Sequence, residues 1–227
     1  MDGGRRVTIA IDGPAGAGKS TVAREAARRL GYAYVDTGAM YRVVALLGLR
    51  KGLSPDDEAG FIAEAASADM EFRMLDGAQR FFVNGEDVTE AVRAPEVGAL
   101  SSPVSAIPEV RRYLTETQRR MVRGGGVVME GRDIGTVVCP GAEVKIFLTA
   151  SVDERARRRC LEQQEKGLDC DPEAVRAGIA ERDHRDSSRA VAPLAKAPDA
   201  VELVTDGLSI GEVIERILAR VRETQGT

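Results

Sequence analysis

The sequence predicts an α/β fold in which helices cover a parallel sheet. Two observations carry this prediction. Residues 7–12 form a largely apolar run of the kind found in buried parallel strands, and a glycine-rich turn and a helical stretch follow at once. Similar runs at 33–36, 127–130, 143–148 and 200–204 alternate with further helical stretches, as in a doubly wound domain.

The composition is that of an ordinary globular protein, with 227 residues, 43% hydrophobic and 30% charged. A net charge of −4 argues against nucleic acid or an anionic membrane as the partner. No apolar run approaches the roughly 20 residues that span a bilayer, and no signal-peptide pattern opens the chain. Cys139, Cys160 and Cys170 are an odd, scattered set. We therefore expect free thiols, no disulfide, no zinc site and a cytoplasmic location.

The turn after the first strand has the spelling of a phosphate-binding P-loop, G-x-x-x-x-G-K-S at residues 13–20. Its glycines permit the backbone angles that direct successive N–H groups around an anion. Lys19 adds a mobile charge, and the Ser20 hydroxyl suits a nucleotide-bound Mg²⁺. The residues expected to bind the triphosphate of ATP are Gly13, Pro14, Ala15, Gly16, Ala17, Gly18, Lys19, Ser20 and Thr21.

Two helices are expected on either side of residue 52. The first begins around Ala39, with Thr37 as its cap, and ends at Lys51. The second opens at Ser54, which would cap it, with Pro55 in its first turn.

Residues 67–97 have a different texture. Residues 70–74 alternate in polarity, and the pairs Asp76-Gly77 and Asn84-Gly85 are strong hairpin signals between short β-prone runs. An antiparallel hairpin does not belong in a parallel sheet. We therefore expect an inserted subdomain at 67–97, within a core made of residues 1–66 and 98–227.

The remainder continues the alternation of helices and strands. A helix is expected at 108–123, and a capping box from Ser151 to Glu154 opens an arginine-rich helix. Asp171-Pro172 starts the next helix, which continues to about residue 189. A second capping box, Ser209 with Glu212, opens a final amphipathic helix.

Two polar segments lie at the carboxyl ends of predicted strands, where α/β sheets place their ligands. In the first, Arg42 could clamp a second phosphate with help from Thr37, or Thr37 could simply cap a helix that carries a surface arginine. In the second, Glu130 could position Mg²⁺ through water while Arg132 pairs with a phosphate, or the segment could be a polar turn.

Arginines are also dense on two predicted helices. Arg155, Arg158 and Arg159 share a helix face, and such runs are usually solvated. Farther on, Arg182, Asp186 and Arg189 are spaced i, i+4, i+7 on one face. They could form structural ion pairs, or the arginines could meet phosphates while Asp186 accepts a hydrogen bond from a sugar hydroxyl. The single histidine, His184, is expected at the surface.

Residues 7–42, 130–138 and 181–194 together resemble the bacterial cytidylate kinases, in order through nearly the whole chain. That family is a branch of the nucleoside monophosphate kinases. The resemblance implies a P-loop NTPase-type sheet, an insert that binds the monophosphate and a short helical lid, here around 160–190. It also implies ATP with Mg²⁺ as donor, CMP or dCMP as acceptor, and a monomer.

The resemblance assigns roles to individual residues. It places Asp36, Thr37, Arg42 and Arg132 around the acceptor. It implies that Ser102, Arg111 and Asp133 recognise cytosine, and that Arg182, Asp186 and Arg189 reach the ribose and phosphates. The expected catalytic residues are Lys19, Arg132, Arg158 and Arg182. The chain departs from some family members at Ala15, where they have serine, and at Glu130, where they have aspartate.

The reaction that this implies is transfer of the γ-phosphoryl group of ATP to CMP or dCMP. The acceptor is a phosphate with a second pKa of ~6, so no general base is required. Two alternatives are a kinase of the uridylate/cytidylate or adenylate type, and an ATP-dependent switch that signals to a protein partner.

Overall fold

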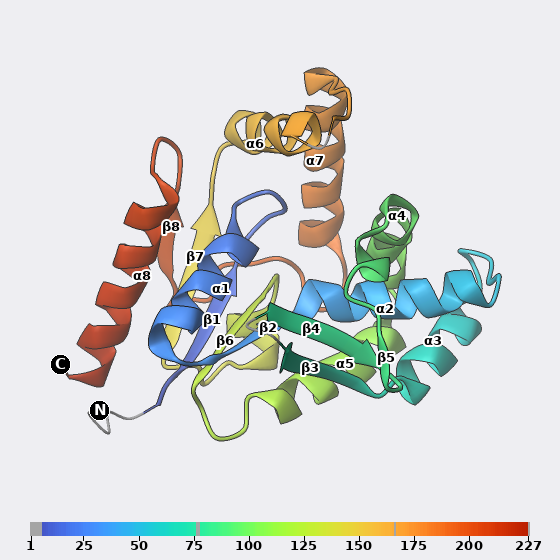
Figure 1. Cartoon of the computed structure of the whole chain (residues 1–227), viewed down its shortest axis with the longest axis horizontal. Coiled ribbons are helices and arrows are strands. Elements are labelled where there is room, and N and C mark those ends of the chain that lie inside the picture. Colours follow the sequence, from blue (N-terminus) through green and yellow to red (C-terminus); the bar gives the residue numbers. More distant parts are fainter. Residues whose placement is uncertain (1–5, 76–77, 166, 227) are drawn as a thin grey trace. The chain divides into compact units, whose positions relative to one another are not determined.

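The structure is a computed structural model that describes residues 6–75, 78–165 and 167–226. The chain divides into two compact units, one formed by Met1–Val35 with Val122–Thr227 and the other by Asp36–Met121. Figure 1 labels their elements. The first unit contains the P-loop, and the second contains the predicted hairpin.

The first unit is built on a five-stranded sheet with the order β2-β6-β1-β7-β8 (Figure 1). The pairs β1–β6, β1–β7 and β7–β8 are parallel, as the apolar runs predicted. The central position of β1 explains why it is buried along almost its whole length. The strands are β1 (Thr8–Asp12), β2 (Ala33–Asp36), β6 (Val127–Gly131), β7 (Val144–Thr149) and β8 (Val201–Val204).

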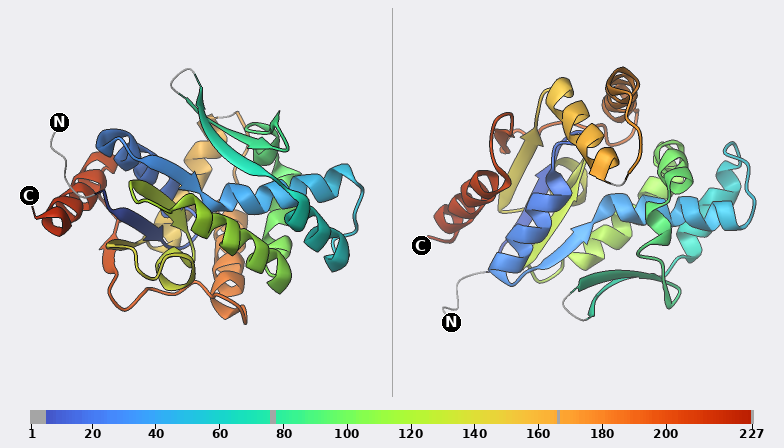
Figure 2. Two further views of the ribbon diagram at one scale, coloured as in Figure 1. Left: turned by 90° about the horizontal axis from the view of Figure 1, so that it is seen from below. Right: turned by 45° about the horizontal axis from the view of Figure 1, so that its top comes forward.

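Helices cover this sheet, as the two views of Figure 2 make visible. Apolar side chains of α1 and α8 form one core with those of β1, β6 and β7. The helices are α1 (Lys19–Leu30), α6 (Val152–Glu165), α7 (Pro172–Ser188) and α8 (Ile210–Gln225), and a π-helical turn, η2 (Ile134–Val138), follows β6. The predicted capping box of α8 is present, with Ser209 and Glu212 bonded reciprocally.

The capping box predicted for α6 is only half formed. The Ser151 hydroxyl accepts a hydrogen bond from the Glu154 N–H at 3.2 Å. The Ser151 N–H, however, donates to the carboxylate of Asp206 at 3.0 Å, because the Glu154 carboxylate is taken up by Arg157 and Arg158. A residue 55 positions away therefore completes the cap.

The second unit combines helices with a small antiparallel sheet of order β3-β4-β5. The hairpin is confirmed, and Phe72 stacks on Phe81 across it with ring centroids 4.2 Å apart. Asn84 and Gly85 form a turn with positive φ angles, whereas the turn predicted at Asp76-Gly77 lies outside the described residues. The elements are α2 (Thr37–Arg50), α3 (Glu58–Ser67), β3 (Met70–Leu75), β4 (Ala78–Val83), β5 (Glu86–Asp87), η1 (Ala91–Arg93), α4 (Pro95–Val104) and α5 (Pro108–Met121).

Two predicted helix caps are wrong. Helix α2 begins at Thr37, and its cap is Asp36, whose carboxylate accepts from the Ala39 N–H at 3.0 Å. Helix α3 begins at Glu58, and its cap is Asp57, not Ser54. In both cases an aspartate with non-helical backbone directly precedes the first helical residue, which is the geometry that capping requires.

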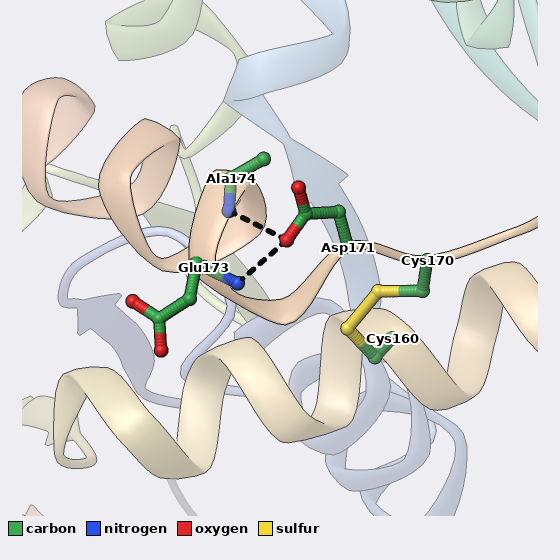
Figure 3. Close-up of a disulfide and its surroundings, with 5 residues drawn as sticks. All are labelled: Cys160, Cys170, Asp171, Glu173 and Ala174. Carbon is green, nitrogen blue, oxygen red and sulfur yellow. Dashed lines mark hydrogen bonds between the residues drawn. A yellow bond between two sulfur atoms is a disulfide. The ribbon is translucent and has the colours of Figure 1, made fainter.

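The expectation of three free thiols is also wrong, because Cys160 and Cys170 form a disulfide (Figure 3). Their Cα atoms lie 5.4 Å apart because the chain reverses direction between α6 and the start of α7. That reversal is a tertiary feature, which cysteine spacing could not reveal. Cys139 is a buried thiol outside the disulfide. Two of the three cysteines on which we based the cytoplasmic location are therefore not free thiols.

Within the described ranges, none of the helices is long and apolar enough to cross a membrane.

Candidate active site

The P-loop adopts a conformation that only its glycines permit. Gly16 and Gly18 have φ angles of +77° and +88°, and Gly13 has φ +150°. A Cβ atom at Gly13 would overlap the carbonyl oxygen of Leu148 at the end of β7. Gly18 immediately precedes α1 and offers no side chain to its first-turn N–H groups. Those donors and the positive end of the helix are therefore available to an anion.

Lys19 is the first residue of α1 and is almost fully buried. Its Nζ donates a hydrogen bond to the carbonyl of Pro14 at 2.7 Å, within the same loop. Burial, together with the nearby positive charge of Arg132, lowers the pKa of this ammonium to about 7. A bound triphosphate would favour the charged form of Lys19, because its negative charge would offset the effects of burial and of Arg132.

Asp12, the last residue of β1, is a site residue that sequence reasoning missed. Its carboxylate accepts hydrogen bonds from the backbone N–H groups of Ile134 at 2.8 Å and Gly135 at 2.7 Å. Asp12 therefore joins the strand that leads into the P-loop to the turn that follows β6. Burial raises its pKa to about 6 despite these two hydrogen bonds. The sequence signal that could have identified Asp12 is a carboxylate at the end of an apolar strand, directly before the P-loop.

Arg132 and Asp133 follow β6 and meet the charged face of α7. Arg132 Nε donates to Asp186 Oδ2 at 2.8 Å, and Arg189 Nη2 lies 3.5 Å from Asp133 Oδ1. Asp186 also lies 4.0 Å from Arg182 Nε and 3.7 Å from Arg189 Nη1. The structure thus brings five of the predicted site residues into one cluster.

The electrostatics of this cluster centre on Asp186, which is buried. Burial acts to raise its pKa, but the surrounding arginines, with Arg132 first, hold it below its ordinary value. Asp186 is therefore ionised at neutral pH and fixes the guanidinium of Arg132 in place. One bond to Asp186 uses only part of the fork of five donors that an arginine presents.

Glu130 is buried in β6, and Tyr34 in β2 donates its hydroxyl hydrogen bond to Oε1. A metal ion held by the protein alone would need several such ligands, and the described residues contain no group of three or more His, Cys, Asp or Glu side chains suited to this. The exposed Ser20 hydroxyl at the start of α1 fits a different arrangement. Mg²⁺ commonly takes one or two protein ligands and completes its shell with phosphate oxygens and water.

The arginine face predicted on α6 is not a uniform solvated surface. Arg159 is exposed and pairs with Glu162. Arg158 donates to Glu154 at 2.8 Å and to the hydroxyl and carbonyl of Thr205 at 3.0 and 2.8 Å. Arg158 Nη1 lies near Gly18, since a Cβ atom added to Gly18 would be 3.8 Å from it. Arg155 is buried against the P-loop and α7. The exposed His184 agrees with prediction.

The other predicted acceptor residues belong to the second unit. Thr37 is buried in the first turn of α2, and Arg42 of the same helix donates to the Val92 carbonyl at 3.1 Å. Arg111 in α5 is buried, lies over the Tyr41 ring at 5.3 Å and donates to the Ser105 carbonyl at 3.2 Å. Ser102 is half-buried in α4, and Asp36 caps α2. The roles of these residues toward an acceptor stay predictions.

In this parallel sheet a buried strand is followed by a P-loop and a helix, and an arginine-rich cluster lies near the loop. These features together define a P-loop phosphotransferase. Comparison with known proteins narrows this class. The family model for cytidylate kinase matches residues 9–223. The chain belongs to the cytidylate kinase family.

Two bacterial proteins are similar to this chain over nearly their full length. The "Cytidylate kinase" of Geobacter sulfurreducens is 50% identical over 223 residues, which cover 98% of this chain and 96% of that protein. The "Cytidylate kinase" of Syntrophotalea carbinolica is 52% identical, with 97% and 94% covered. A crystal structure of an uncharacterized protein from Eubacterium ventriosum is similar in fold alone, with a TM-score of 0.53, 12% identity, and 96% and 99% of the two chains covered.

Proposed function

We propose that this protein transfers the γ-phosphoryl group of ATP to CMP or dCMP, giving ADP and the corresponding diphosphate. The observation that carries this proposal is the cluster of Arg132, Asp133, Arg182, Asp186 and Arg189 in the same unit as the P-loop. A P-loop alone would suit many nucleotide-binding proteins. The family match over residues 9–223 supports CMP as the acceptor.

The chemistry is that of two anions brought together. The acceptor phosphate is mostly ionised at neutral pH, because its second pKa is ~6, and it can attack without a general base. The chain must therefore supply positive charge and alignment. Lys19 would offset the negative charge of the donor phosphates and orient them. Arg132, Arg182 and Arg189 would offset the negative charge of the phosphates during transfer. Arg158, beside Gly18, would act with them.

Ser20 would hold Mg²⁺ together with phosphate oxygens and water. When bound, the ion supplies charge that neutralises the β- and γ-phosphates. Glu130, whose Oε1 accepts a hydrogen bond from Tyr34, would act on the ion through a bridging water.

We further propose that Thr37 and Arg42 bind the acceptor phosphate, that Asp36 lies at the acceptor site as the cap of α2, and that Ser102 and Arg111 with Asp133 recognise cytosine. Buried Arg111 is held by Tyr41 and Ser105, which would restrict it to one orientation toward a base. We assign the monophosphate-binding insert to 67–97 and a water-excluding lid to the described part of 160–190. A monomer that works in the cytoplasm, where nucleotides are interconverted, completes the proposal.

The deciding experiment is an acceptor panel. Purified protein receives ATP and Mg²⁺ with CMP, dCMP, UMP or AMP, and ADP release is followed in a coupled assay. We expect rapid release with CMP and dCMP and slow release with UMP and AMP. A strong preference for AMP would overturn the assignment of the base, and ADP release that ignores every acceptor would favour an ATP-dependent switch.

A further inference from the structure

Arg155 lies in the first turns of α6, and its side chain is only 4% exposed. Its guanidinium group has three partners in three segments. Nε donates to the Ala150 carbonyl at 3.0 Å, Nη1 donates to the Ala15 carbonyl at 3.0 Å, and Nη2 lies 2.6 Å from Asp183 Oδ2. Because a buried guanidinium needs such partners to offset its lost hydration, this arrangement fixes the side chain tightly.

The contact with Ala15 determines how one peptide unit of the P-loop is oriented. The carbonyl and N–H of a planar trans peptide point in opposite directions. With the Ala15 carbonyl held toward the Arg155 guanidinium, the N–H of Gly16 points away from that guanidinium. The arginine stem also packs on this unit, since a Cβ atom on Gly16 would lie 3.3 Å from Arg155 Cβ. In a P-loop such N–H groups cradle the phosphates.

The contact with Asp183 connects the same guanidinium to α7. Asp183 follows Arg182 in the chain and lies one turn before Asp186. Its Oδ1 atom is buried, without a hydrogen-bond partner among the described residues. Among the described residues, the ion pair with Arg155 holds this carboxylate, and it connects Arg155 to the helix that contains Arg182 and Asp186 and ends next to Arg189.

We propose that Arg155 is a positioning residue that sets the orientation of the Ala15–Gly16 peptide and couples it to α7 through Asp183. The proposal rests on the phosphotransfer proposed above. Arg155 acts without touching the nucleotide. It orients the Gly16 N–H, a donor for the triphosphate, and through Asp183 it orients the helix that carries Arg182. The P-loop donor and this arginine therefore move together.

Arg155→Lys is the most informative variant, because it keeps the charge and removes the three-way fork. A lysine ammonium can approach the Ala15 carbonyl or Asp183, but it cannot reproduce the planar geometry that reaches all three partners. Asp183→Asn removes the ion pair and leaves the contact with Ala15. Arg159→Ala is the matched control, since Arg159 lies on the same helix, is exposed and forms a surface ion pair with Glu162.

The test combines kinetics, stability and NMR on the full-length protein. We expect Arg155→Lys to lower kcat by about tenfold or more and to leave the KM for CMP within about twofold. The change in the Gly16 amide resonance on adding ADP should shrink markedly in this variant. Asp183→Asn should lower kcat less, and the double variant should be no worse than Arg155→Lys, because the two residues act as one unit.

Four outcomes would overturn the proposal. One is a fall in melting temperature with normal kcat, which would mean that Arg155 only supports the fold. Another is a lowered kcat with an unchanged Gly16 response to ADP, which would place its effect elsewhere. The third is additive losses in the double variant, and the fourth is an equal loss in Arg159→Ala. Wild-type ADP release with CMP is measured in the same assay, so a failure of the proposed reaction would be seen separately.

Discussion

Lys19 is the residue at which the loss of one charge should lower kcat most. It is buried at the start of α1 and bonds to the Pro14 carbonyl of the loop it serves. We expect Lys19→Ala to lower kcat by roughly a thousandfold or more, because charge stabilisation at the transferred group is lost. Affinity for CMP should remain nearly unchanged. Arg28→Ala, an exposed change on the same helix, is the control. A coupled assay with calorimetry of CMP binding measures both, and near-normal turnover would contradict the role.

Asp12 should make stability depend on pH in an unusual direction. Burial raises its pKa from 3.8 to about 6, so the folded state holds this proton more tightly than the unfolded chain does. The resulting stabilisation is present below the unfolded pKa and is lost as pH rises through about 6. Relative to Asp12→Asn, the free energy of unfolding of the wild type should fall by about 2 kcal/mol between pH 4.5 and 7. Urea unfolding at several pH values measures it; a constant difference would refute it.

Single residues also mark the limit of what the sequence predicts about the site. The P-loop spacing and the i, i+4 spacing of Arg182 and Asp186 were sufficient to predict which groups lie together, because helix geometry makes them neighbours. Arg189 also reaches Asp186, but it lies just past the end of α7 with extended backbone, so the helical i+7 spacing is not the reason. Arg155 and Arg159 have similar sequence surroundings, yet one is buried and the other exposed. What separates them is contact with a distant segment of the chain, which no local pattern contains.

At the scale of elements, the disulfide should stabilise the arm formed by α6 and α7. It closes a loop with a sequence separation of 10, for which the loss of chain entropy in the unfolded state amounts to roughly 3 kcal/mol. Reduction, or the Cys160→Ser variant, should lower the free energy of unfolding by about that amount, measured by urea titration with and without reductant. Cys139→Ser provides the control, since that thiol is outside the disulfide. Equal stability with and without reductant would contradict this expectation.

The elements themselves were largely predictable, because buried strands and hairpin turns have strong local signals. Val7 to Asp12 and the Asn84-Gly85 turn are examples. The ends of helices were less so. Asp36 and Thr37 are both good capping residues, and only the backbone conformation at residue 36 decides between them. The cap of α6 depends on Asp206, far away in the chain.

For the whole molecule, binding of each nucleotide should appear as added stability. A ligand at about 100 times its Kd raises the free energy of unfolding by roughly 2.7 kcal/mol. We expect ADP and CMP each to raise the melting temperature of the wild type. In Lys19→Ala the shift with ADP should shrink and the shift with CMP should persist. Thermal scans with each nucleotide measure this, and equal loss of both shifts would mean that Lys19 serves the fold and not the donor.

The bond between Cys160 and Cys170 also changes how the covalent chain responds to a cut. Leu168 lies between the two cysteines and is 57% exposed, so a protease that cleaves after large apolar residues can reach it. The two fragments would stay joined through sulfur. Such a nicked molecule would run at full length on a denaturing gel and separate into two bands only after a reducing agent is added.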